Sequence, residues 1–274
     1  MSRTLLERAR KAFQTAINSQ DTSKVYANCK SAAELYERAF KASQRSQRAK
    51  RNQQPTDVNP LEVIAQELGA VYCFTGNLYM IVEEDERAAR CYDAAIKMLS
   101  GEQKTDALVG RAAVKKRRKD FSGAIDDING VLMLAPEKRD ECHYNLGLIG
   151  IDREDYGFAL ENLQKSVQVN PEFAIAHAHL GDVYRILGDT KRAQHQYERA
   201  LQVTEGRMDR LDMRDYRGAI RAEIGLVCHL SQEREPRFSR MALSKGLLSQ
   251  QEIMSLTHFK HVGVRTLYPL RKPG

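Results

Sequence analysis

The stretch from Asn170 to Val203 (NPEFAIAHAHLGDVYRILGDTKRAQHQYERALQV) constrains the fold of this chain more than any other. It opens with Asn-Pro, which is a helix-start signal because proline has no N–H to leave unsatisfied in the first turn. Two groups of residues follow at helical spacing, on either side of the breaker pair Gly188-Asp189: Leu180, Gly181 and Tyr184, then Ala193, Tyr197 and Ala200. The pattern predicts two short helices joined by a tight turn, in which small residues let the helices approach and large ones fill the remaining space.

The same pattern recurs three more times upstream. The turns are marked by Asp120, Asp155 and Asp189, which are 35 and 34 residues apart. The matching positions in the earlier copies are Leu146, Gly147, Ala159 and Leu163; Leu108, Ala112, Ala124 and Ile128; and Tyr72, Gly76, Ala88, Tyr92 and Ala95. Four copies in near register predict an array of helix pairs rather than a single globular core.

This spacing resembles the tetratricopeptide repeat (TPR) family, whose period is about 34 residues. The resemblance covers residues 60–204 and implies an all-α fold, a TPR-type α-solenoid in which antiparallel helix pairs form a right-handed superhelix. Three residues depart from the family pattern, since Arg111 and Lys115 stand where Leu and Tyr are usual and Gly150 replaces a Tyr. The first helix of the second copy is therefore the least typical element.

The flanks of the array predict the remaining organisation. Residues 1–52 form an N-terminal helical pair, a degenerate repeat whose YERAF segment echoes YERAL at 197–201, and residues 53–59 form a linker. After the four repeats at 60–204, amphipathic segments predict C-terminal capping helices over 205–258, with Ser249 and Glu252 as a capping box. Residues 259–274 are expected to form an extended tail.

The formal net charge of +7 is unevenly distributed along the chain. The repeats are mildly acidic, whereas both flanks are basic, and basic flanks suit either a solvated surface or contact with anionic partners such as nucleic acid, acidic protein or lipid headgroups. Five scattered cysteines without a C-x-x-C pair suit an intracellular, reducing compartment. The cytoplasm is favoured, and a mitochondrial location is possible because residues 4–18 form a basic amphipathic opening.

The sequence holds no pattern typical of a catalytic or metal site. There is no H-E-x-x-H, P-loop or G-x-S-x-G motif, and the seven histidines are spread without a third ligand beside any pair. We therefore expect a protein that is not an enzyme and that needs no metal or cofactor. No apolar run is long enough to span a membrane.

The TPR resemblance implies a concave groove, lined by the first helix of each pair, that binds a peptide or a partner helix. Carried over by register, the groove residues have mixed polarity, which suits an apolar segment with some polar anchoring. They are Phe74, Asn77, Met80, Lys116, Arg117, Tyr144, Asn145, Leu148, Ile151, His179, Asp182 and Arg185. Among them only Asn77 matches the carboxylate clamp of chaperone-binding TPR domains, so the C-terminal motif of heat-shock chaperones is an unlikely ligand.

These observations favour a protein–protein interaction scaffold, as a subunit or assembly factor of a larger complex. The alternative is an RNA-contacting subunit of a ribonucleoprotein such as an organellar ribosome, with phosphates bound by basic residues of the two flanks. Those residues are Arg45, Arg48, Lys50, Arg51, Arg271 and Lys272. A third hypothesis is that the tail 259–274 occupies the protein's own groove.

Overall fold

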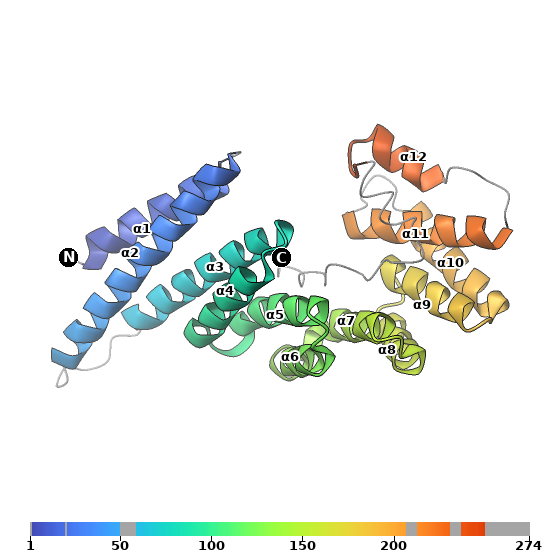
Figure 1. Ribbon diagram of the computed structural model, residues 1–274, viewed down its shortest axis with the longest axis horizontal. Coiled ribbons are helices and arrows are strands. Elements are labelled where there is room, and N and C mark those ends of the chain that lie inside the picture. The colour runs from blue at the N-terminus through green and yellow to red at the C-terminus, as the bar shows by residue number, and fades with distance from the viewer. Residues whose placement is uncertain (1, 20, 50–58, 207–212, 231–236, 250–274) are drawn as a thin grey trace. The chain divides into compact units, whose positions relative to one another are not determined.

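The computed structural model describes residues 2–19, 21–49, 59–206, 213–230 and 237–249 (Figure 1). Within these ranges the chain forms α-helices and two short 3₁₀ turns and contains no strand, so the predicted all-α class is confirmed. Several predicted features lie outside the described residues: the linker up to residue 58, the second half of the capping box, the tail 259–274, and Lys50, Arg51, Arg271 and Lys272. The side chain of Arg48 is also outside them.

The described residues divide into two compact units, one on each side of the boundary between Lys115 and Lys116. The first unit holds two antiparallel helix pairs and most of a fifth helix. Its helices are α1 (Ser2–Ile17), α2 (Thr22–Ala49), α3 (Pro60–Ile81), α4 (Asp85–Met98) and α5 (Thr105–Arg117), the last preceded by a 3₁₀ turn at Gly101–Lys104. The residues of the predicted N-terminal pair form α1 and α2. The segment that departs most from the family pattern, the first helix of the second copy, forms α5.

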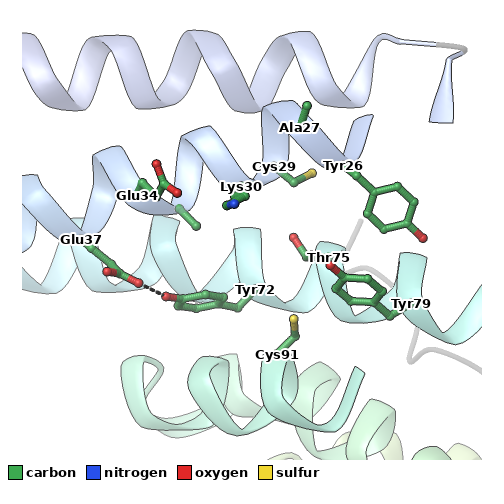
Figure 2. A pocket seen from close by; sticks show the side chains of 11 residues that line it. Tyr26, Ala27, Cys29, Lys30, Glu34, Glu37, Tyr72, Thr75, Tyr79 and Cys91 are labelled. Carbon is green, nitrogen blue, oxygen red and sulfur yellow. Dashed lines mark hydrogen bonds between the residues drawn. The ribbon is translucent and has the colours of Figure 1, made fainter. Parts of the chain in front are cut away.

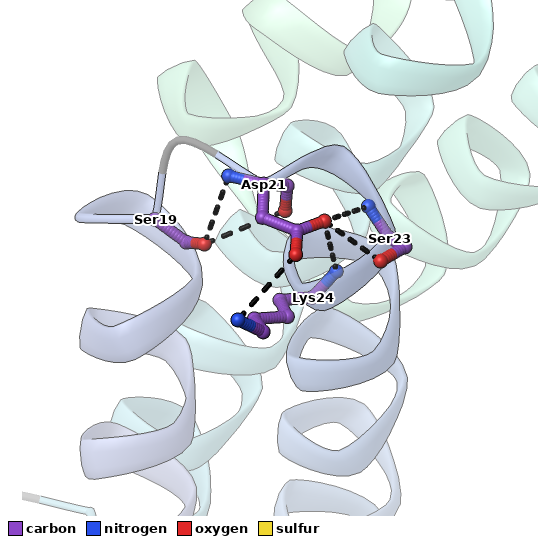
Figure 3. A network of polar contacts seen from close by, with 4 residues as sticks. All are labelled: Ser19, Asp21, Ser23 and Lys24. Atoms are coloured by element: carbon purple, nitrogen blue, oxygen red, sulfur yellow. Dashed lines mark hydrogen bonds and ion pairs between the residues drawn. The ribbon is translucent and has the colours of Figure 1, made fainter.

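Helices α1 and α2 pack through a cluster of apolar side chains, and a polar N-cap begins α2. Ala9, Tyr36 and Leu68 are buried in one cluster that joins α1, α2 and α3. Asp21 caps α2, since its carboxylate accepts hydrogen bonds from the backbone N–H and hydroxyl of Ser23, at 3.0 and 2.7 Å, and from the N–H of Lys24 (Figure 3). The Ser23 hydroxyl and the Lys24 N–H lower the pKa of Asp21, because each favours the charged carboxylate.

The second unit continues the helix pairs. Its helices are α6 (Phe121–Leu134), α7 (Arg139–Asp152), α8 (Tyr156–Val169), α9 (Ala174–Ile186), α10 (Thr190–Glu205), α11 (Met213–Leu230) and α12 (Arg237–Ser244), with a 3₁₀ turn at Pro136–Lys138. In α7 with α8 and in α9 with α10, the two helices pack directly on each other, and α11 packs on both α9 and α10. Figure 1 shows α12 beside α11, which agrees with the buried contacts of Tyr216 and Ala242 in one cluster.

The turn inside each helix pair has the same conformation in all four copies. Glu83, Lys119, Glu154 and Gly188 have φ of 60°, 62°, 59° and 81°, the left-handed region. In three copies the next residue is an aspartate whose carboxylate accepts from a backbone N–H at the start of the second helix, as Asp189 does from Arg192 at 3.0 Å. A left-handed residue that ends one helix, followed by an N-cap that starts the next, reverses the chain within a few residues.

Helix pairs approach closely because a glycine on the first helix faces a tyrosine or leucine on the second. A Cβ atom at Gly181 would lie 2.5 Å from Cε1 of Tyr197, so no larger residue fits without movement. On its other side the same ring meets Gly225 of α11, where a Cβ would lie 2.3 Å from Cζ. Tyr197 is therefore inserted between two glycines, and α11 packs beside α9 and α10 as the first helix of a further pair would.

One predicted helix start is wrong. The Asn170-Pro171 pair does not begin α9, which starts at Ala174. The reason is a local turn: the side-chain oxygen of Asn170 accepts from the N–H of Glu172 at 3.2 Å, and its carbonyl accepts from the N–H of Phe173 at 3.1 Å. The signal is correct at Pro60, which stands at the first position of α3 behind the cap Asn59.

We predict that Gly181→Ala destabilises the second unit. Overpacking against Tyr197 costs about 1–3 kcal/mol, whereas alanine gains only about 1 kcal/mol of helix propensity over glycine. The urea midpoint, followed by circular dichroism, is expected to fall. Gly157→Ala is the matched control, because Gly157 is exposed and a Cβ there meets only one atom within 4 Å, at 3.7 Å; its midpoint should stay or rise. A Gly181→Ala midpoint equal to or above that of the control would contradict the packing described here.

Candidate partner-binding surface

The predicted groove residues recur at a fixed register in three first helices. We call the glycine that faces a tyrosine or leucine of the second helix the packing glycine. The groove residues lie two positions before it, one position after it and four positions after it, so they form one ridge along each helix. Around Gly76 in α3 they are Phe74, Asn77 and Met80; around Gly147 in α7, Asn145, Leu148 and Ile151; around Gly181 in α9, His179, Asp182 and Arg185. We call this side of α7, α9 and α11, with Lys116 and Arg117 at the end of α5, the first-helix face of the second unit.

In the first unit the three groove residues have structural contacts of their own. Phe74 packs edge-on against Phe13 of α1, with ring centroids 5.6 Å apart. The exposed Asn77 accepts a hydrogen bond from the Tyr92 hydroxyl at 2.7 Å, and the half-buried Met80 packs on the cluster around Tyr92. Asn77 is thus the most accessible of the three, and its side chain is already oriented by α4.

In the second unit most of the predicted groove residues are buried. Tyr144, Asn145 and Leu148 on α7 are fully buried, and His179 and Asp182 on α9 are nearly so. The Tyr144 ring lies 5.6 Å from that of His179 and 5.1 Å from that of Phe173, so α7 and α9 share an aromatic contact. Ile151, Arg185 and Arg117 are half-buried near the ends of their helices.

Ion pairs join the first helices of this unit to one another. Lys116 Nζ lies 2.7 Å from Asp152 Oδ2, which links the end of α5 to the end of α7. Burial lowers the pKa of Lys116, and Asp152 opposes that shift. Two arginines of α11 complete the set: Arg214 Nη1 lies 2.8 Å from Glu141 Oε1 on α7, and Arg221 Nη1 lies 2.7 Å from Asp182 Oδ2 on α9. These contacts bring opposite charges together in pairs, so the face does not present a large field of one sign.

Asp182 is the centre of the network on α9. One carboxylate oxygen accepts from Arg221 and the other from the Tyr197 hydroxyl at 2.9 Å. Burial raises the pKa of Tyr197, so its hydroxyl keeps the proton that it donates. The tyrosine that sets the helix spacing therefore also orients a groove residue, just as Tyr92 orients Asn77 in the first unit.

His179 is a neutral member of this network. Burial lowers its pKa well below the ordinary value, and the positive charges of Arg221 and Lys116 lower it further. Its Nδ1 lies 3.7 Å from Asp182, too far for a hydrogen bond. His177, by contrast, has a structural role, since its two ring nitrogens contact Gln196 Oε1 at 2.8 Å and the Pro171 carbonyl at 3.0 Å.

Asn145 is a polar residue of the face whose amide makes no hydrogen bond within the described part of the chain. Its amide nitrogen and its amide oxygen are both buried and have no hydrogen-bond partner. Burying an amide without a partner costs about 1–3 kcal/mol. An amide presents a donor and an acceptor side by side, which is the complement of one residue of an extended backbone.

Sequence reasoning missed the two arginines of α11. Arg214 and Arg221 were not distinguished from the other charges of a capping helix, yet they pair with α7 and α9. Gly225 lies against the Tyr197 ring as Gly110 lies against the Tyr92 ring, but the two glycines follow their tyrosines at different spacings, so periodicity gave no signal for α11. Of the six residues predicted to contact phosphate, only the exposed Arg45 has its side chain among the described residues.

The four cysteines that the structure describes form no disulfide with one another. Cys29 and Cys142 are buried and Cys73 and Cys91 half-buried. Burial raises the pKa of the Cys142 thiol to about 12 and that of Cys91 to about 11, so both stay protonated. In the described part of the chain, no group of three or more His, Cys, Asp or Glu residues could hold a metal ion, and no helix could cross a membrane.

Comparison with known proteins agrees with this geometry. Residues 174–206, which span α9 and α10, match the tetratricopeptide repeat family model. The chain carries a tetratricopeptide repeat. The matched segment holds both members of the Gly181–Tyr197 contact and three of the predicted groove residues. No curated protein sequence matches the chain.

Solved structures support the TPR fold over more of the chain. PilF of Pseudomonas aeruginosa is similar with a TM-score of 0.51 and 15% identity, covering 89% of this chain and 91% of PilF. A double mutant of MamA from strain RS-1 has a TM-score of 0.50 and 18% identity, covering 75% and 97%. YrrB, described as a TPR protein with an unusual peptide-binding site, has a TM-score of 0.43 and 16% identity, covering 74% and 95%. At these identities the likeness concerns the fold, a TPR-type α-solenoid of paired helices.

We predict that His179 makes stability depend on pH below neutrality. Because its folded-state pKa is depressed, its contribution is complete above the unfolded-state value of about 6.5 and is lost as the pH falls towards the folded-state value. Between pH 7.5 and 5.5 the loss should approach about 1 kcal/mol. Urea titrations at both pH values should show this loss of unfolding free energy in the wild type and not in His179→Asn. His195→Asn is the control, since His195 is exposed; a pH dependence that survives in His179→Asn would show that other groups cause it.

Proposed function

We propose that the protein is a non-enzymatic protein–protein interaction scaffold, a subunit or assembly factor of a larger complex. The first-helix face of the second unit would bind an apolar segment of a partner protein in an extended conformation. The tetratricopeptide repeat supports this, because proteins of this type mediate protein–protein interaction. The RNA-contacting alternative and the self-occupied groove remain predictions that rest mainly on residues outside those described.

The unpartnered Asn145 is the observation that carries the proposal. A buried amide without partners is expensive for folding, and Asn145 does not contribute to the packing glycine contact, the turns or the ion pairs of the unit. Because Asn145 is fully buried, a partner backbone would satisfy both amide atoms once the side chains that cover them move aside. Because the neighbouring charges are already paired, recognition on this face would depend on hydrogen bonds and on apolar contact with the half-buried Ile151 more than on net charge.

We predict opposite effects of Asn145→Leu on stability and on binding. Leucine has the same branched shape and removes two unsatisfied polar atoms, so the free energy of unfolding should rise, by about 1 kcal/mol because its larger methyl groups offset part of the gain. Affinity for the native partner should fall by roughly 10-fold or more, since one residue of the partner backbone loses two hydrogen bonds. Asn162→Leu is the matched control, because the Asn162 amide is also buried but contacts His143 and the Phe158 carbonyl, so its loss should destabilise the unit.

Site-specific photocrosslinking in extracts of the native source tests which surface of the protein contacts its partners. A photoreactive residue at Asn77 or Arg185, on the first-helix ridges, should crosslink to a defined partner, and the same residue at the exposed Glu198 of α10 should not. Purification with affinity mass spectrometry identifies the partner, whose affinity for the Asn145→Leu variant is then measured. Equal crosslinking from Glu198 and from the ridge positions, or unchanged affinity in Asn145→Leu, would reject the first-helix face as the binding surface.

A further inference from the structure

A second candidate site lies in the first unit, away from the first-helix ridge. A cleft of about 380 Å³ opens between α2, α3 and α4 (Figure 2). We call it the tyrosine cleft, after the side chains that give it its character: Tyr26, Tyr72 and Tyr79, with Glu34, Glu37 and Cys91. This volume is at the lower end of the range for ligand sites, so it suits one long side chain better than a large molecule.

The tyrosine cleft and the predicted groove use opposite sides of α3. At 100° per residue, Tyr72, Thr75 and Tyr79 fall on one side of the helix, whereas Phe74, Asn77 and Met80 fall on the other. Figure 2 shows Tyr72 and Thr75 between α2 and Cys91 of α4. An occupant of the cleft therefore does not compete for the ridge residues of α3.

The aromatic walls of the cleft are held in place before any ligand arrives. The Tyr72 hydroxyl donates to Glu37 of α2, and the Tyr26 hydroxyl donates to the Leu78 carbonyl at 3.0 Å. The rings of Tyr26 and Tyr79 lie 5.2 Å apart. Fixed rings lose little conformational freedom on binding, so they form a preorganised surface.

The charges of the lining favour a cation. Glu34 and Glu37 both face the cleft from α2, and one lysine, Lys30, lines it as well. Glu34 is exposed. Glu37 accepts from Tyr72, which leaves its other carboxylate oxygen for a second donor. The two carboxylates outnumber the single ammonium group, so the cleft is net negative within a unit whose N-terminal flank is basic.

The floor of the cleft is apolar and aromatic, which suits a guanidinium on a long stem. Ala33 and Cys91 offer non-polar contact for methylene groups, and burial raises the pKa of the Cys91 thiol to about 11, so it is uncharged. A guanidinium stacks on a tyrosine face and binds carboxylates through its planar fork, whereas an ammonium group does neither as well. This protein already places Arg87 over the Tyr79 ring, 5.7 Å from its centroid.

From these observations we infer that the tyrosine cleft binds an arginine side chain of a partner protein. The stem lies on Ala33 and Cys91, and the guanidinium lies between the tyrosine rings and the carboxylates of Glu34 and Glu37. Lys30, exposed at the mouth, opposes binding and moves aside. The cleft is then a second docking point, independent of the first-helix face.

The test uses the full chain and a defined probe, the blocked peptide acetyl-Ala-Ala-Arg-Ala-Ala-amide. The matched control peptide carries norleucine in place of arginine. Binding is measured by NMR titration, and occupancy by the rate at which N-ethylmaleimide alkylates Cys91, resolved by peptide mass spectrometry. Cys73 is the internal reference, because it is half-buried but does not line the cleft.

The arginine peptide should slow alkylation of Cys91 and not of Cys73, and the norleucine peptide should have no effect at the same concentration. Glu34→Gln should weaken binding roughly 3- to 10-fold and Lys30→Gln should strengthen it roughly 2- to 5-fold, since each changes one exposed charge beside the guanidinium. Equal protection by norleucine, protection by neither peptide, or the reverse response of the two charge variants would each overturn the inference. Asn145→Leu should leave peptide binding unchanged, which separates this site from the first-helix face.

Discussion

The contact between a glycine on one helix and a tyrosine on the next is the constraint on which each unit depends. Tyr197 is inserted between Gly181 and Gly225, and Tyr92 is inserted in the same way between Gly76 and Gly110. A large ring fills the space between helices only if the facing residue has no side chain, so the distance between helices is set by that pair. Each ring thus fixes two interfaces at once, one within its own helix pair and one with the following first helix.

The same rings connect the packing to the proposed binding surface. A tyrosine buried at this place must find a partner for its hydroxyl, and the partner is Asn77 in one unit and Asp182 in the other. Both are ridge residues one position after the packing glycine. The two copies in between have Ile128 and Leu163 at the tyrosine position, which have no hydroxyl, and Leu148 after Gly147 needs no polar partner. At the position one after the packing glycine, the polarity of the ridge therefore follows from the core residue beneath it.

Much of the fold could be predicted from the sequence because its determinants are local and periodic. The helix pairs follow from apolar spacing, and the turns follow from the aspartate caps at Asp120, Asp155 and Asp189. The start of α9 could not be predicted, because the Asn170 side chain stabilises a turn that competes with the helix. Periodicity also predicts which residues share the ridge, but it does not predict that His179 and Asp182 are buried, since burial depends on what α11 places beside them.

The position of α11 explains why the first-helix face of the second unit differs from a simple open groove. Its Gly225 accepts the ring of Tyr197, so α11 takes the place of another first helix, and its arginines then meet Asp182 and Glu141. Pairing these charges offsets part of the desolvation penalty that isolated buried carboxylates would carry. Asp152 Oδ1 and Arg221 Nε also lack a hydrogen bond, but both residues form an ion pair through another atom, whereas neither atom of the Asn145 amide has a partner. If the role of Asn145 were structural, its amide should contact the helices around it, as the amide of Asn162 does through His143 and Phe158. The contrast between these two buried asparagines in neighbouring helices is the physical reason to look for a partner at one of them and not at the other.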